Sequence, residues 1–93
     1  METRHKINGQ KGSFQAVQDN IQAGEMTYVF AGDTRFIIDH TEVDEAFVGK
    51  GVSLKMVLDA VDFARENKFK VLPLCPFAKS VFDKRPELRD VLS

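Results

Sequence analysis

The periodicity of the apolar residues changes once along the chain, at the run Val48-Gly49-Lys50-Gly51-Val52, and this change constrains the fold more than any other feature. Before it, short apolar runs broken by turn residues predict strands over residues 13–17, 26–31 and 35–43. After it, apolar residues at helical spacing predict a long helix over 52–65 that stops near Asn67, which tolerates the left-handed conformation. The remaining expected elements are a strand over 70–74, a second helix over 77–84 and a final turn over 86–92.

The order of these elements predicts a mixed sheet. Because a strand, a turn, a helix and a second strand form a right-handed crossover, strand 70–74 should run parallel to strand 35–43. The turns at 20–24 and 32–34 make the earlier strands antiparallel, whereas residues 4–7 are too weakly patterned to assign a further strand. We therefore expect residues 1–93 to form a single α/β (α+β) domain, with a mostly antiparallel sheet, one long helix on its face and a shorter C-terminal helix.

The strand over 35–43 becomes polar toward its C-terminal end, as strands that border a site often do. Strict alternation places Phe36, Ile38, His40 and Glu42 on one face, and Ile37, Asp39, Thr41 and Val43 on the other. The phenylalanines fall at core spacings of strands or helices. We expect a core that contains Phe14, Phe30, Phe36, Phe63, Phe69, Phe77 and Phe82.

Charge and composition exclude several classes of protein. The 13 basic and 14 acidic residues are interspersed and the formal net charge is -1, so we expect no nucleic-acid partner. No apolar run approaches the roughly 20 residues that cross a bilayer, and residues 1–6 lead into a polar segment rather than a signal peptide. We therefore expect a cytoplasmic protein without a membrane partner. One cysteine and two distant histidines make no ligand cluster, so we expect no metal.

The glycine run lies between a strand and a helix, where the unpaired N–H groups of the helix N-terminus favour an anion. Glycine lets a phosphate approach the backbone, and Lys50 adds a mobile positive charge. The run lacks the complete P-loop and dinucleotide-binding patterns. By residue types alone, the two glycines could equally make only a tight turn.

Four segments together resemble a subfamily of very small GNAT-superfamily acetyltransferases: His40-Thr41-Glu42-Val43, Gly49-Lys50-Gly51-Val52, Ala64-Arg65 and, most specific, Pro73-Leu74-Cys75-Pro76-Phe77-Ala78-Lys79. The resemblance covers residues 14–88 and implies a GNAT-like fold. It also implies acetyl-CoA as the cosubstrate and an amine as the acetyl acceptor. The implied cofactor-binding residues are Val43, Val48, Gly49, Lys50, Gly51, Val52, Ser53, Cys75 and Lys79.

The chain departs from the wider superfamily in two ways. The acetyl-CoA motif Gln/Arg-x-x-Gly-x-Gly/Ala would run from Val48 through Gly51 to Ser53, and its first and last positions do not match. We expect weaker CoA binding, with the backbone donors intact. The chain also has no room for the helix pair that commonly shapes the amine site. This leaves an open acceptor site that suits a protein terminus, a lysine or a partner protein that completes it.

Three residues are candidates for the chemistry. Cys75 follows the strand after the crossover, which in the resembled fold borders the gap that holds the thioester. Its thiol could accept the acetyl group or protonate the departing CoA. His40 could take a proton as its partner, and Glu42 could orient that imidazole or act through water. Each has an ordinary alternative: a buried packing cysteine, a structural histidine and a solvated carboxylate.

The resulting hypothesis is an N-acetyltransferase-like enzyme that uses acetyl-CoA to acetylate an unidentified amine, directly or through Cys75. The competing hypothesis is a non-catalytic acyl-CoA-binding or adaptor module. Two features favour it: Val48 stands where the superfamily motif has Gln or Arg, and the chain has no room for the helix pair that shapes the amine site. A third is a domain for a different phosphate ligand. Lys79, with Lys84 and Arg85, gives the last helix a basic side that either contacts the adenosine 3′-phosphate or is only solvated.

Overall fold

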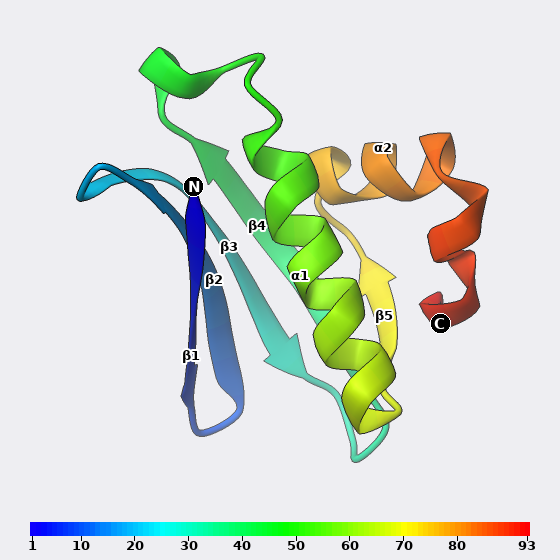
Figure 1. Ribbon diagram of the computed structural model, residues 1–93. Coiled ribbons are helices and arrows are strands. Elements are labelled where there is room, and N and C mark those ends of the chain that lie inside the picture. Colours follow the sequence, from blue (N-terminus) through cyan, green and yellow to red (C-terminus); the bar gives the residue numbers. More distant parts are fainter.

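The computed structural model describes residues 1 to 93 and contains one five-stranded sheet. The strands lie side by side in chain order: β1 (Glu2–Asn8), β2 (Lys11–Gln18), β3 (Ile21–Phe30), β4 (Arg35–Val43) and β5 (Lys70–Pro73). The helices are α1 (Val52–Asn67), α2 (Pro76–Lys84) and two 3-10 segments, η1 (Glu45–Phe47) and η2 (Pro86–Val91). α1 lies across one face of the sheet, and α2 lies beyond it near the C-terminus (Figure 1). None of the helices has the length and apolar composition needed to cross a membrane.

The sheet is mixed, as the sequence predicts. β1 to β4 pair antiparallel, and β5 runs parallel to β4. The turn before β3 is shorter than predicted, because only Asp19 and Asn20 take positive φ angles, of 53° and 66°. Residues 21–24, predicted as turn, therefore belong to β3.

α1 begins and ends beside residues in the left-handed conformation. Gly51 precedes it with a φ of 78°, which glycine adopts without steric cost. At the other end Lys68 has a φ of 60°, and its N–H bonds to the carbonyl of Ala64. Asn67 is the last helical residue, and its side-chain amide donates to the carbonyl of Phe63 over 2.9 Å. The left-handed cap thus lies one residue beyond the predicted position.

A bulge in β4 reverses the predicted faces of its second half. The register with β3 skips Asp39, which is therefore an extra residue in β4. Ile38 is buried, whereas His40 and Glu42 are exposed and Thr41 is buried in their place. The prediction that His40 and Glu42 share a face with Ile38 is wrong, because strict alternation holds only where the ladder is regular.

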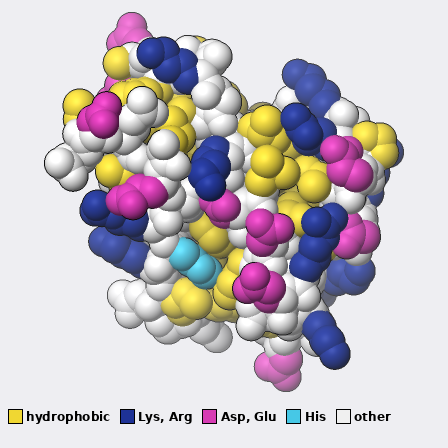
Figure 2. Space-filling model, in the orientation of Figure 1, with side chains coloured by type: hydrophobic (Ala, Val, Ile, Leu, Met, Phe, Trp, Pro, Cys, Tyr) yellow, Lys and Arg dark blue, Asp and Glu magenta, His cyan; other side chains and the backbone are white.

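The core contains 19 buried residues from the sheet, both helices and η2. α1 approaches β3 so closely at Gly24 that a Cβ there would lie 2.8 Å from Val52 Cγ1. Six of the seven phenylalanines expected in the core lie in it or pack against it, but Phe77 is 54% exposed. The prediction for Phe77 is wrong because the first turn of α2 directs this side chain outward. On the face that carries α1, apolar patches lie among interspersed acidic and basic side chains (Figure 2).

Candidate functional site

The turn between β4 and α1 presents free backbone donors. Gly49 and Gly51 have φ angles of 82° and 78°. The N–H groups of Gly51, Val52 and Ser53 make no hydrogen bond, and the ladder of α1 begins with the N–H of Lys55, which bonds to the Gly51 carbonyl over 3.0 Å. Free donors at the positive end of a helix can bind an anion.

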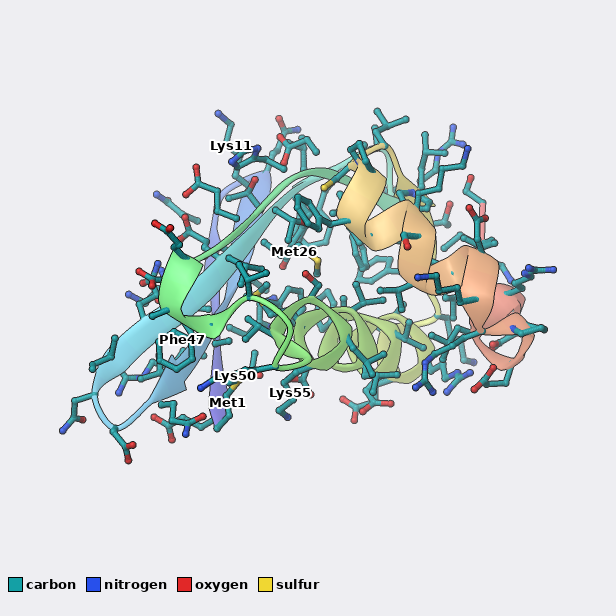
Figure 3. The ribbon with its side chains drawn as sticks, turned by 90° about the horizontal axis from the view of Figure 1, so that it is seen from above. Met1, Lys11, Met26, Phe47, Lys50 and Lys55 are labelled. Atoms are coloured by element: carbon teal, nitrogen blue, oxygen red, sulfur yellow. The ribbon has the colours of Figure 1, made fainter.

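The segment before these donors is held in place by its own contacts. Asp44 Oδ1 accepts the N–H of Ala46 over 2.9 Å and so caps η1. The N–H of Lys50 bonds to the carbonyl of Phe47 over 3.2 Å, so this amide is not a free donor. The Lys50 ammonium lies 5.8 Å from the centre of the Phe47 ring, and both residues belong to the segment between β4 and α1 (Figure 3). Lys50 can therefore contribute its charge to the turn, but not its backbone.

β4 and β5 separate after a short parallel pairing. The pairing ends where Ile38 lies opposite Pro73. The Ile38 carbonyl then accepts two N–H groups, from Leu74 over 3.0 Å and from Cys75 over 3.2 Å. β4 continues to Val43 with no strand on this side, because the chain after β5 turns into α2. The second half of β4 is thus an open edge whose backbone groups can bind a ligand.

Three cavities meet beside this edge, and Phe77 lines all of them. The first measures about 300 Å³ and is lined by Val43, Val48, Gly49, Gly51, Val52, Ser53, Leu54 and Phe77. The second, of about 540 Å³, lies between α1 and α2 and shares Ser53 and Leu54 with the first. The third, of about 440 Å³, lies at the ends of β3 and β4 and shares Val43. We call this continuous surface the Phe77 groove.

The structure gathers most, but not all, of the residues implied for the cofactor. Six of those nine residues line the first cavity, namely Val43, Val48, Gly49, Gly51, Val52 and Ser53. Lys50, Cys75 and Lys79 line no part of the Phe77 groove. Lys84 and Arg85 do line its second cavity. Of the three basic residues of the last helix named above, Lys84 and Arg85 therefore line the groove and Lys79 does not.

Cys75 is buried and makes no hydrogen bond to its predicted partners His40 and Glu42. Cys75 is 4% exposed, belongs to the core cluster and precedes α2 as its N-cap. The Nε2 atom of His40 lies 2.9 Å from Oε1 of Glu42, and no hydrogen bond joins His40 to Cys75. The His40 and Glu42 side chains are 61% and 72% exposed. His40 and Glu42 thus form one pair on the open face of the sheet, whereas Cys75 faces the core.

Thr41 and Phe77 are among the groove residues that sequence reasoning missed. Thr41 is 4% exposed, lines the third cavity, and its hydroxyl has no hydrogen-bond partner. Its burial follows from the bulge at Asp39, which has no signal in the sequence. Phe77 was assigned to the core, and its only signal was its place directly after Cys75-Pro76 in the most specific segment.

Comparison with known proteins identifies the family. The family model described as GCN5-related N-acetyl-transferase matches residues 13–91, which include most of β2, all of β3 to β5 and both α-helices. The chain belongs to the GCN5-related N-acetyltransferase (GNAT) family. Its mixed five-stranded sheet with two main helices is the GNAT fold. No curated protein matches this GNAT sequence.

Solved structures agree with the GNAT assignment. A GCN5-like protein from Staphylococcus aureus, solved by NMR, is 32% identical, with a TM-score of 0.71, over 97% of this chain and 87% of that chain. Ribosomal-protein-alanine N-acetyltransferase from Brucella melitensis biovar Abortus 2308 is 17% identical, with a TM-score of 0.69, over 83% and 64% of the two chains. AAC(6′)-Iy, in complex with the bisubstrate analogue CoA-S-monomethyl-acetylneamine, is 12% identical, with a TM-score of 0.59, over 87% and 62%. The last two share the fold with this GNAT protein, which spans less than two thirds of their length.

Proposed function

We propose that this GNAT protein binds acetyl-CoA in the Phe77 groove and transfers the acetyl group to an amine. The free N–H groups of Gly51, Val52 and Ser53 at the positive end of α1 carry this proposal. They suit a pyrophosphate, and they lie next to a cavity that continues toward two cations, Lys84 and Arg85. A neighbour with the same fold, AAC(6′)-Iy, holds a CoA-containing analogue, which supports the same use of the fold here.

The groove offers a place for each part of acetyl-CoA. The pyrophosphate would accept hydrogen bonds from the turn, and the adenosine 3′-phosphate would lie near Lys84 and Arg85 between α1 and α2. The pantetheine arm would follow the open edge of β4, where the backbone of Thr41 and Val43 has no neighbouring strand on the β5 side. The thioester would then reach the point where β4 and β5 separate.

In a direct transfer, the amine nitrogen attacks the thioester carbonyl carbon and the carbon–sulfur bond breaks. CoA leaves as a thiolate that takes up a proton, and the amine nitrogen loses one. His40 can accept the proton of the amine, because its Nε2–H is donated to the carboxylate of Glu42 and its Nδ1 remains an acceptor. In this route the amine approaches from the open face of the sheet, where both side chains are exposed.

Cys75 offers a second route. Its sulfur would attack the thioester carbon, release CoA as the thiol and hold the acetyl group until the amine removes it. The place of Cys75 directly after β5, beside the open edge of β4, favours this route. Its 4% exposure means that the side chains around it must shift to admit the thioester.

A non-catalytic acyl-CoA-binding module is the alternative function. The 67% exposed Val48 supplies no polar side chain to the pyrophosphate turn, and the 4% exposed Cys75 makes no hydrogen bond to His40. Both observations are consistent with a protein that binds acyl-CoA without catalysing acetyl transfer.

Mass spectrometry of the wild type and Cys75→Ala, mixed with acetyl-CoA with and without an amine, tests the proposal. Native spectra report the CoA complex, denaturing spectra report an acetyl adduct, and released CoA reports turnover. Because Cys75 is the only cysteine, an adduct that is lost in Cys75→Ala belongs to it.

The outcomes separate the routes. A complex with an adduct on Cys75 supports the covalent route, and a complex with amine-dependent CoA release but no adduct supports direct transfer. A complex without CoA release supports the binding module. The absence of any complex contradicts the assignment of the groove.

A further inference from the structure

The outer edge of β1 is not covered by any other part of the protein. Six of the seven residues of β1 are exposed, and α1 packs mainly on β2, β3 and β4 (Figure 1). The other outer edge of the sheet, at β5, is closed by C-terminal residues. Val71 forms a parallel bridge with Leu92, and its carbonyl accepts the N–H of Ser93 over 2.9 Å. An uncovered edge strand can pair with a strand of another molecule.

The pairing of β1 with β2 determines which backbone groups of β1 point outward. Asn8 and Lys11 flank the turn Gly9-Gln10, whose glycine has a φ of 64°, and such a two-residue turn closes on a hydrogen-bonded pair. The Gln10 carbonyl accepts the N–H of Phe30 over 2.7 Å, so the even-numbered residues of this segment bond toward β3 and the odd-numbered residues of β2 bond toward β1. The N–H and C=O groups left at the free edge of β1 are those of Thr3, His5 and Ile7.

The side chains of β1 are complementary to the same side chains read in reverse. When two copies of β1 lie antiparallel about a two-fold axis at Arg4, Glu2 of each copy lies opposite Lys6 of the other. In the same register Met1, directly before β1, lies opposite Ile7, and these two apolar residues are 44% and 54% exposed in the single chain. The register therefore joins opposite charges twice and apolar side chains twice.

The free backbone groups and the charges select this register. Hydrogen bonds across the edge require odd-numbered residues to lie opposite odd-numbered residues, which places the axis at a residue. An axis at His5 would place Arg4 opposite Lys6, and like charges there destabilise a sheet, whereas an axis at Thr3 would pair a shorter segment. With the axis at Arg4 the two Arg4 side chains lie opposite each other, but each already donates to Glu2 of its own chain over 3.2 Å.

From these observations we infer that two copies of this chain pair through β1, antiparallel about a two-fold axis at Arg4, and form one continuous sheet. The axis is normal to the sheet, so both α1 helices lie on the same face with the two β1 strands between them. A single pair of strands is smaller than the roughly 1,200 Å² of a standard stable interface, so the dimer is weak. No residue of β1 lines the Phe77 groove, so the inference does not depend on acetyl-CoA.

Sedimentation equilibrium of the full chain, from about 10 μM to about 1 mM, measures this association, and we expect half of the chains to be dimeric at roughly 0.1 mM. Lys6→Glu turns both opposite-charge pairs into like-charge pairs, so it should weaken the dimer about tenfold. Lys68→Glu is the matched control. It makes the same change of charge at the end of α1, outside β1, and should leave the dimer intact.

A mixture of two variants tests the register itself. Glu2→Lys alone should weaken the dimer as Lys6→Glu does, because it also places like charges opposite each other. An equimolar mixture of Glu2→Lys and Lys6→Glu should associate again, since each cross-strand pair then joins a lysine to a glutamate. Native mass spectrometry with one variant ¹⁵N-labelled detects the mixed dimer by its mass.

Hydrogen exchange of the wild type locates the interface without any substitution. The amides of Thr3, His5 and Ile7 should exchange freely in dilute protein and more slowly as the concentration rises. The amides of Arg4 and Lys6 bond to β2, so they should be protected at every concentration.

A monomer over the whole concentration range overturns the inference. So does a dimer that Lys6→Glu leaves unchanged, or a mixture of the two variants that does not recover. Association without added protection of the three outward amides would place the interface elsewhere and would also overturn it. Circular dichroism shows whether each variant folds, and if one does not, the exchange pattern of the wild type decides.

Discussion

At the scale of single residues, Gly51 has a left-handed backbone conformation and also lies in the proposed binding site for acetyl-CoA. Its φ is 78°, and an added Cβ would meet no atom within 4 Å, so Gly51→Ala should fold with about 1 kcal/mol lost to left-handed strain. The methyl group would stand among the free N–H groups and hold a phosphate away from them. We expect acetyl-CoA to bind about tenfold more weakly, measured by calorimetry.

Gly9→Ala is the matched control for this substitution. Gly9 also has a positive φ, of 64°, with no atom near an added Cβ, but it lies in the β1–β2 turn. It should lose similar stability and keep its affinity for acetyl-CoA. Equal affinities for the two variants would show that the Gly51 backbone does not hold the cofactor.

Individual side chains were the least predictable part of the site. His40 and Glu42 were expected to act together, and the structure pairs them at 2.9 Å, but on the opposite face from the one predicted. The reason is the bulge at Asp39, since an extra residue in a strand follows from its pairing with β3 and not from its own sequence. The roles of Cys75, His40 and Glu42 in catalysis stay predictions.

At the scale of elements, β1 pairs with β2 and also adds the His5 ring to the aromatic cluster of the sheet. The His5 ring stacks on Phe14 with the ring centres 4.1 Å apart, and its Nε2 lies 2.6 Å from the hydroxyl of Tyr28. Burial raises the pKa of Tyr28 to about 12 and lowers the pKa of His5. Near pH 7 the phenol therefore stays protonated and can donate to a neutral imidazole.

This contact predicts a pH dependence of stability. The pKa of His5 is below its ordinary value in the folded protein, so the unfolded chain takes up the proton first as the pH falls. The stabilisation is complete above about pH 6.5 and decreases as the pH falls toward the lower folded pKa. The Tm of the wild type should therefore fall more between pH 7.5 and 5.5 than that of His5→Asn, which cannot titrate. Parallel Tm curves in thermal unfolding followed by circular dichroism would contradict this role of His5.

Elements with a buried face were predicted well, and β1 was not. β4 and α1 carry apolar residues at the period of their structure, and β4 has the predicted bounds. Six of the seven residues of β1 are exposed, so this edge strand has no alternation to detect. Its formation depends on pairing with β2, which lies beyond local sequence pattern.

At the scale of the whole molecule, the crossover pattern in the sequence predicted the parallel pairing of β5 with β4. The groove itself could not be predicted, because it forms where segments distant in the sequence meet. Its lining comes from residues 41–44, 48–54 and 77–87, with a contribution from β3.

The most direct test of the groove is a titration of the ¹⁵N-labelled protein with acetyl-CoA, followed by amide NMR shifts. Binding as proposed should shift the amides of Gly49 to Leu54 most, followed by those of Thr41 and Val43 on the open edge of β4. The amides of the β1–β2 turn, residues 8–11, should not move. Saturable shifts centred elsewhere, or none at Gly51 to Ser53 at millimolar acetyl-CoA, would show that this turn is not the cofactor site.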